Sequence, residues 1–288
     1  MATKLQMMSE LAALTTEQLT QSKENWTSFL DSAAWLYKYP FHEQVLIHAQ
    51  RPDATACAPI ELWNNTFRRW VNKGAKGIAI IDDSGQKPTL RYVFDVSDTN
   101  TRYNVPFSLW QTRPEYEAQI VEELQNHFGD IGVEDADFSS AVLGIAINAV
   151  SDNYDDYKNE LLKAAGNSAL ADMSDDEISS TFMVLLMTSV AHTVFVRLGI
   201  DAAAIFHGDE YDSISLFNSP DTIAQLGAAT SDISEMVLRQ MERSVRSIER
   251  QERDTLAKSQ QVLQNEDRKN ERSVEHGTQL QAERGLPD

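Results

Sequence analysis

Basic and aromatic side chains gather in one short stretch of an otherwise acidic chain. The ten residues from Phe67 to Lys76 include the cations Arg68, Arg69, Lys73 and Lys76, the aromatic Trp70, and no acidic residue. Cations bind phosphates and ring faces stack on unpaired bases, so this mixture is typical of single-stranded nucleic-acid binding. A solvated helix end and turn, with its aromatic residues in the core, would have the same composition. Trp63 and Tyr92 offer further ring faces for stacking.

Helices and a strand pair are expected to position this basic run. Hydrophobic residues at helical spacing predict helices over residues 17–37, 41–50 and 59–70, with breaks at Pro40 and Pro52. A buried strand is predicted over GIAII, followed by the hairpin loop DDSGQK. A half-buried strand is predicted over TLRYVFDV, where Leu90, Tyr92, Phe94 and Val96 alternate with Arg91, Val93 and Asp95. Residues 1–108 are therefore expected to form an α+β domain of helices and a small antiparallel sheet.

Four polar or small residues near the run leave two interpretations open. Gln44 and Gln50 lie near one face of the second predicted helix, where they either read bases or cap buried backbone groups. Gly74 and Gly77 either let the backbone approach a phosphate or serve a turn and a tight strand start.

The pattern becomes helical and acidic from Leu109 onward. Net charges of −6, −5 and −5 fall in three successive blocks of fifty residues, 101–150, 151–200 and 201–250. About six helices are expected in an all-α domain over 109–250, with capping boxes at Thr112–Glu115 and Ser174–Glu177. The predicted helices cover a segment with Ile120, Leu124 and Phe128 on one face that ends at Gly129, then 138–150, 154–162, a long apolar segment ending at Gly199, a short segment from Pro220 to Gly227, and one that begins near Ser231. Residues 251–288 are charged and Gln-rich, which predicts a flexible tail within a longer polypeptide. The first part of this tail either is flexible as well or extends the preceding helix.

Composition excludes several classes of protein. The single Cys57 excludes an intrachain disulfide and indicates a reducing compartment. The apolar run from Phe182 to Leu198 contains polar residues, which predicts a buried helix and no membrane span. Together with the absence of a signal-type apolar core at the N-terminus, these features predict a cytoplasmic protein.

No arrangement of side chains indicates a metal, a cofactor or a catalytic centre. The only His-Glu pair, His42-Glu43, has Leu46 where a zinc-protease helix needs its second histidine, and His192 is followed four residues later by Val196. The acidic loop from His207 to Asp212 lacks the spacing of a calcium loop, which favours a solvated loop. The chain is therefore not expected to be an enzyme.

A longer set of residues resembles a known family. The segments Tyr39–Phe41, Ala49–Ala54 and Val71–Ile81, with Gln44, Leu46 and Trp63, resemble the N-terminal domain of ArdC-type antirestriction proteins. They resemble more closely the related head domain of large multi-domain proteins of conjugative elements and phages of Firmicutes, which the run Tyr92–Thr99 also fits. It implies that the N-terminal domain binds single-stranded DNA. Ser189–Asp201 resembles a helix of the zinc-metalloprotease-like domain that follows in ArdC-type proteins, which implies a degenerate, metal-free relative over 109–250.

Two functions of different classes follow. The first is a single-stranded DNA-binding module of a mobile-element protein, accessory to DNA transfer or antirestriction. The second is an acidic antidefence factor whose helical half binds a host restriction enzyme or other nuclease. The residues expected to contact nucleic acid are Arg68, Arg69, Trp70, Lys73, Lys76, Gln44, Arg51 and Tyr92.

Overall fold

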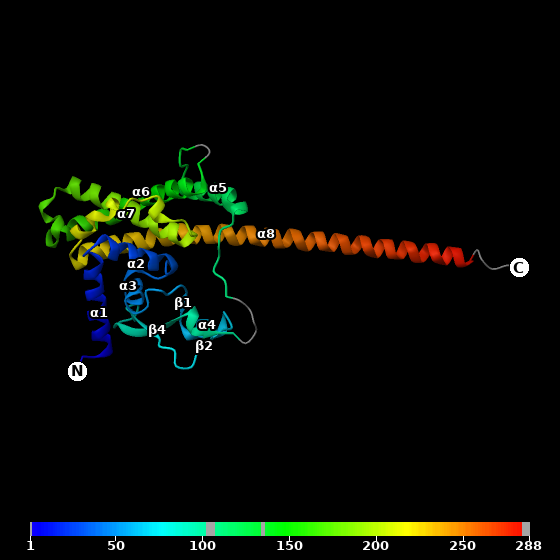
Figure 1. The fold of residues 1–288 in the computed structure, drawn as a ribbon, viewed down its shortest axis with the longest axis horizontal. Helices are drawn as coiled ribbons and strands as arrows, with labels where there is room; N and C mark the ends of the chain where they lie inside the picture. Colours follow the sequence, from blue (N-terminus) through cyan, green and yellow to red (C-terminus); the bar gives the residue numbers. More distant parts are fainter. Residues whose placement is uncertain (1, 102–106, 134–135, 284–288) are drawn as a thin grey trace. The chain divides into compact units, whose positions relative to one another are not determined.

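A computed structural model describes residues 2–101, 107–133 and 136–283. Residues Met1–Glu242 form one compact unit and Arg243–Asp288 form a second. The first unit holds a small β-structure beside helices α1 to α4, and a set of longer packed helices (Figure 1). The predicted fold class, an α+β segment followed by a helical region, is confirmed.

The N-terminal segment contains three helices: α1 (Lys4–Leu19), α2 (Lys23–Trp35) and α3 (Phe41–Gln50). The single helix predicted over 17–37 is wrong, because Ser22 is extended and ends its continuity. The Ser22 hydroxyl accepts a hydrogen bond of 3.2 Å from the Asn25 backbone N–H and so caps α2. Helix α3 begins after Pro40 and ends before Pro52, as predicted.

Two small antiparallel sheets follow α3. Strands β1 (Cys57–Ala58), β4 (Thr89–Asp95) and β3 (Ile78–Asp82) form one sheet in the order β1-β4-β3. Strand β2 (Trp70–Val71) pairs with β5 (Thr99–Asn100) in the other. The β3–β4 hairpin is the predicted strand pair. Its buried residues share one hydrophobic cluster with α2, α3 and the segment after α3: Leu36, Leu46, Ile47, Ala54, Ile78, Ile80 and Val93.

Strand β4 buries the face opposite to its more apolar one. Val93 and Asp95 are buried, whereas Tyr92 is 38% exposed. The Asp95 carboxylate is satisfied there by backbone N–H groups of Thr55 and Ala56, at 2.8 and 3.0 Å, and by both donors of Ser97. Burial raises the pKa of Asp95, but these hydrogen bonds outweigh it and hold the pKa below its ordinary value.

Helix α4 (Ile60–Asn65) is shorter than the predicted helix over 59–70. Asn64, Asn65 and Thr66 are weak helix formers, and the chain leaves the helix there. Arg68 then adopts a positive φ of 52°, and Trp70 pairs with Asn100 in the second sheet. The basic run is therefore a loop and a short strand.

The remaining α-helices are α5 (Glu117–Phe128), α6 (Phe138–Ala164), α7 (Asp175–Leu198) and α8 (Pro220–Glu283). The capping box at Ser174–Glu177 is confirmed, as is the end of α7 at Gly199 with a φ of 75°. The one predicted at Thr112 does not form, since a 3₁₀ turn with no side-chain cap precedes α5. The 3₁₀ segments are η1 (Val96–Asp98), η2 (Pro114–Tyr116), η3 (Ala165–Asn167), η4 (Ala169–Asp172), η5 (Ala202–Ala204) and η6 (Asp209–Leu216).

Helices α6 and α8 each replace two predicted helices. Gly227 was expected to end a helix but lies inside α8, where a Cβ atom would be 2.3 Å from Cε2 of Phe41. The glycine therefore allows close packing and does not end the helix. Residues 251–283 are also helical, where a flexible tail was predicted. The segment 228–276 contains neither glycine nor proline and is rich in Glu, Arg and Gln, which favour helix.

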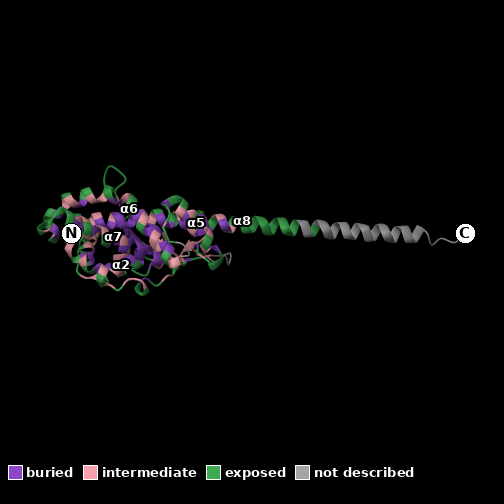
Figure 2. Cartoon of the chain, turned by 90° about the horizontal axis from the view of Figure 1, so that it is seen from above, coloured by how far each residue is buried: buried purple, intermediate pink, exposed green. Residues whose placement is uncertain are grey.

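Helix α7 is the core helix of the first unit and packs against α6 and α2. Buried residues are concentrated in these packed helices (Figure 2). Trp26 Nε1 of α2 donates a 2.9 Å hydrogen bond to Ser189 Oγ of α7, and both side chains are fully buried. The predicted boundary at residue 108 therefore does not separate two compact units.

Helix α7 is also long and apolar enough to cross a membrane by composition. Among the described residues it is the one helix that meets this test, and 67% of its apolar window is buried inside the fold. Such burial fits the core helix of a soluble protein, as the polar residues within the run predicted.

Candidate nucleic-acid interface

The basic run forms an exposed segment between α4 and β3. The side chains of Arg68, Lys73 and Lys76 are exposed, and none forms an ion pair with any described residue. Cations without carboxylate partners remain available to phosphates. We call these three residues the basic segment.

The two glycines of this segment have conformational and packing roles. Gly74 has a φ of 90°, which L-residues rarely adopt, and it lies beside a turn in which the Ala75 N–H bonds the Asn72 carbonyl at 3.0 Å. A Cβ atom on Gly77 would lie 3.1 Å from the Phe94 ring and 3.2 Å from the Tyr92 ring. These contacts favour the turn and strand-start interpretation of both glycines.

Arg69 and Trp70 are less exposed than the three cations. Arg69 Nε donates to Thr99 Oγ1 at 2.7 Å and its Nη2 donates to the Thr99 carbonyl at 3.1 Å. Trp70 is half-buried in β2. These two residues fix the path of the chain between the sheets and leave Arg68 at the surface.

Gln44 has a structural role in place of the predicted contact with nucleic acid. Its side chain is 1% exposed, and Nε2 donates to the Leu36 carbonyl at 3.2 Å. Gln50 has a comparable role at the sheet edge. Its Oε1 accepts from the Ala79 N–H at 3.0 Å, and its Nε2 donates to the Ala79 carbonyl at 2.8 Å. Of the two interpretations of these glutamines, the structure favours backbone capping.

Arg51 is engaged within the protein. Its Nη1 lies 2.6 Å from the Asp98 carboxylate, and its Nη2 donates to Ser97 Oγ at 2.7 Å. A phosphate would have to compete with this ion pair. Arg51 therefore serves first to join the end of α3 to the η1 turn.

Tyr92 lies beside the basic segment. Its ring contacts the position of Gly77, the residue after Lys76, and the Lys4 ammonium lies 4.7 Å from the ring centroid. The pairing of β3 with β4 in the hairpin brings it there. Of the predicted residues, Tyr92 thus joins Arg68, Lys73 and Lys76 on accessible surface.

Phe67 is an exposed aromatic residue that sequence reasoning assigned to a helix face. It is 41% exposed and its ring packs 5.1 Å from Trp63 and 5.5 Å from Phe107, between ring centroids. Trp63 itself is buried and donates from Nε1 to the Phe94 carbonyl, so it cannot stack on a base. The helix-breaking Asn-Asn-Thr sequence before Phe67 was the signal that could have placed it outside the helix.

A cavity of about 770 Å³ lies next to Arg69 and Phe107. It is also lined by Arg197 of α7 and by the indole rings of Trp35 and Trp110. Its lining contains no carboxylate among the residues that the structure describes. We call it the arginine cavity; the sequence did not point to Arg197, whose neighbours come from distant segments.

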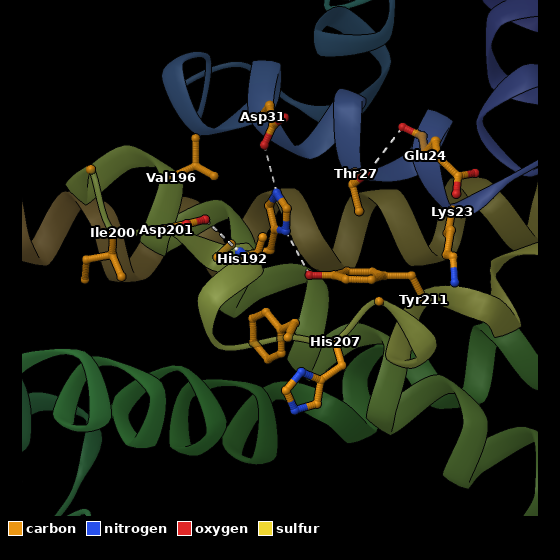
Figure 3. Close-up of a pocket in the computed structure, with 15 residues that line it drawn as sticks. Lys23, Glu24, Thr27, Asp31, His192, Val196, Ile200, Asp201, His207 and Tyr211 are labelled. Atoms are coloured by element: carbon orange, nitrogen blue, oxygen red, sulfur yellow. Dashed lines mark hydrogen bonds and ion pairs between the residues drawn. The ribbon is translucent and has the colours of Figure 1, made fainter.

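A second cavity, of about 820 Å³, contains a hydrogen-bond relay in which His192 and Tyr211 are buried and Asp31 is exposed (Figure 3). His192 Nε2 lies 2.9 Å from Asp31 Oδ1, and its Nδ1 lies 2.8 Å from the Tyr211 hydroxyl. Since a carboxylate only accepts, His192 Nε2 donates to Asp31. Burial raises the pKa of Tyr211, so its hydroxyl stays protonated at neutral pH. The relay connects α2, α7 and η6.

Acidic residues near this second cavity are committed to protein contacts. Asp212 pairs with Lys23 at 2.9 Å, and Glu210 accepts from the Gly208 N–H at 2.9 Å.

The His-Glu pair of the sequence also has a structural role, because Glu43 is buried and accepts from Arg91 at 2.6 Å. Within the described residues, no three His, Cys, Asp or Glu side chains are grouped to hold a metal ion.

The basic segment, its flanking rings and the arginine cavity all contain cations or aromatic rings, and the described lining of the cavity contains no carboxylate. Comparison of the chain with protein families, with curated proteins and with solved structures finds no match.

Proposed function

We propose that the protein binds single-stranded DNA through the basic segment. The observation that carries the proposal is the set of three exposed cations, Arg68, Lys73 and Lys76, that lack ion-pair partners among the described residues of a chain with net charge −19. In so acidic a protein, most exposed cations would be expected to find a carboxylate. Unpaired cations in a cluster suit a polyanion.

The aromatic side chains at the two ends of the segment favour single strands over duplex. Phe67 precedes Arg68, and Tyr92 lies against Gly77. A ring can stack only on a base whose face is free, and each such stack contributes about 1–3 kcal/mol. Phosphate contacts from the cations would add sequence-independent, salt-sensitive affinity.

The resemblance of the first 110 residues or so to ArdC-type proteins supports the same function. It further supports a role in the cytoplasm as an accessory to DNA transfer or antirestriction in a mobile element. Binding alone requires no catalytic group. The acidic helices would repel a strand elsewhere and so restrict it to the basic segment.

Fluorescence anisotropy with the full chain tests the proposal. Labelled single-stranded and duplex oligonucleotides of one sequence would be titrated at several salt concentrations. We expect tighter binding to the single strand, weakening as salt rises. Replacing Arg68, Lys73 or Lys76 by Ser removes one phosphate contact, which should weaken binding about five- to tenfold near 50 mM salt and reduce the log–log salt slope by about 0.7.

Lys87→Ser is the matched control, because Lys87 is an exposed lysine in the hairpin loop outside the basic segment. It changes the net charge by the same amount and should leave affinity almost unchanged. An equal loss of oligonucleotide affinity in the control and in the three variants would mean that affinity depends on net charge and not on the basic segment. Absence of binding by the wild-type chain at low salt would overturn the proposal.

A further inference from the structure

The arginine cavity contains a buried cation whose hydrogen-bonding capacity is mostly unused. Arg197 is 4% exposed, yet its one hydrogen bond to a described residue runs from Nη2 to the Trp110 carbonyl, at 2.9 Å. A guanidinium has five N–H donors. With Nη2 bonded to Trp110, the Nε and Nη1 atoms of Arg197 have no protein acceptor in the described part of the chain. Buried charges normally have partners, which makes this arrangement unusual.

Arg197 also lacks a carboxylate within ion-pair distance among the described residues. The acid that acts on it through space is Glu242, whose carboxylate already accepts from the Tyr37 hydroxyl at 2.7 Å and pairs with Lys38 at 2.6 Å. Burial lowers the pKa of Arg197, but arginine starts so high that it stays charged at neutral pH. The cavity therefore carries a positive charge that an anion would compensate.

Aromatic rings hold this guanidinium in place. The Arg197 Cζ atom lies 3.9 Å from the Trp110 ring centroid and 5.2 Å from that of Trp35. This stacking fixes the planar group and leaves its edge for a bidentate oxyanion. Trp35 and Trp110 also line the cavity, together with Phe107.

Arg69 supplies a second cation to the same cavity. Its bonds to Thr99 use Nε and Nη2, while Nη1 has no hydrogen-bond partner among the described residues. Hydroxyl groups of the lining offer further donors to phosphate oxygens: Thr55, Ser108 and Thr112. The volume of about 770 Å³ lies within the range of small-molecule sites, so it can accept more than a bare phosphate.

We propose that the arginine cavity binds one phosphorylated nucleotide, with its phosphate on Arg197 and Arg69 and its base against the aromatic lining. Two sources supply this chemistry: a free nucleotide or the phosphorylated end of a DNA strand. The second source rests on the proposed single-strand binding. Phe107 lines the cavity and its ring contacts that of Phe67, so a strand on the basic segment has a short path to the site.

Isothermal titration of the full chain distinguishes the ligands. We expect deoxythymidine monophosphate to bind more tightly than inorganic phosphate, and deoxythymidine without phosphate to bind most weakly. Equal affinity for the nucleotide and for phosphate would contradict the role of the aromatic lining. Absence of saturable nucleotide binding up to about 10 mM would overturn the site.

Two variants assign the binding to the cavity. Arg197→Lys keeps the charge but loses the bidentate edge, and Arg69→Gln loses the second cation at the rim; each should weaken nucleotide binding about tenfold or more. If Arg197→Lys does not fold, the Arg69→Gln variant and the wild-type ligand series still show whether the nucleotide binds in the arginine cavity. Unchanged nucleotide affinity in Arg69→Gln and in any folded Arg197→Lys protein would refute the assignment.

Strand-end binding is tested separately from binding along the strand. A 5′-phosphorylated and an unphosphorylated oligonucleotide would be compared, then their 3′-phosphorylated counterparts. A tighter complex with either phosphorylated end, lost in Arg197→Lys, would show that the cavity binds the phosphorylated end of a strand. Equal affinity for the phosphorylated and unphosphorylated oligonucleotides would mean that the cavity binds the free nucleotide instead. The triple variant Arg68→Ser, Lys73→Ser, Lys76→Ser should lose strand binding yet keep nucleotide binding, so the two proposals can fail independently.

Discussion

At the scale of single residues, hydrogen-bond partners separate functional candidates from structural ones. Gln44 and Arg51 have the side chains that a nucleic-acid site would need, but their donors are used on Leu36, Asp98 and Ser97. Arg197 had no sequence signal, yet it retains free donors beside a cavity. What a polar side chain can bind depends on the bonds that it has already made.

Asp95 should make the stability of the protein depend on acidity. Its folded pKa lies below the unfolded value near 3.9, so its stabilisation is complete above that value and is lost as pH falls through the folded pKa. Asp95→Asn places an amide among N–H donors and should lower the free energy of unfolding at pH 7 by about 1–3 kcal/mol. Urea denaturation at pH 7 and below pH 4 should show this difference shrinking at the acidic pH.

Asp83→Asn serves as the control, because Asp83 is exposed in the hairpin loop. It should change the free energy of unfolding by less than about 0.5 kcal/mol. A constant difference between wild type and Asp95→Asn at both pH values would show that the Asp95 charge does not contribute.

At the scale of elements, close contacts decide where helices lie and whether they continue. Gly227 has the residue type of a helix end, but the Phe41 ring occupies the space that a side chain would fill. Helix α8 can therefore pass close to the start of α3. The missing side chain is a packing requirement here and does not signal a turn.

Gly227→Ala should destabilise the protein despite the better helix propensity of alanine. A Cβ atom 2.3 Å from Phe41 forces α3 and α8 apart, and overpacking of this kind costs about 1–3 kcal/mol. Thermal denaturation followed by circular dichroism measures the change. Gly166→Ala is the control, since its Cβ would meet no atom within 4 Å, and it should be neutral or slightly stabilising. A Gly227→Ala protein as stable as the control would contradict the close packing.

At the scale of the whole molecule, the residues on both sides of the predicted boundary at 108, up to Glu242, belong to one compact unit. The buried Trp26–Ser189 bond and the bond between His192 and Asp31 connect residues on opposite sides of the predicted boundary. The arginine cavity is likewise lined by residues from both sides. A site of this kind exists only when the two parts fold together.

Leu161→Ala tests this cooperativity. Leu161 is fully buried in α6, far in sequence from the sheet, and its truncation should cost about 2–4 kcal/mol. In one cooperative unit, the slowest amides of β4 would lose the same protection and exchange at least about thirtyfold faster. Leu14→Ala, at an exposed leucine of α1, should leave exchange unchanged. Unchanged protection of β4 in Leu161→Ala would indicate two independent domains.

Local patterns in the sequence were sufficient for the fold class and for several elements. The Pro40 and Pro52 breaks, the β3–β4 hairpin, the capping box at Ser174 and the end of α7 at Gly199 depend on neighbours within a few residues. The exposed cations of the basic segment were also found this way, because charge clusters are visible in the sequence.

The buried face of β4, the packing at Gly227 and the surroundings of Arg197 were decided by the tertiary structure. Each depends on contacts between residues far apart in the chain: Asp95 with Thr55, Gly227 with Phe41, and Arg197 with Trp35 and Trp110. Sequence alone determined that this protein has a small sheet, long helices and one basic stretch. Only folding determined which cations stay unpaired and where a cavity forms, because burial and charge pairing are properties of the assembled chain.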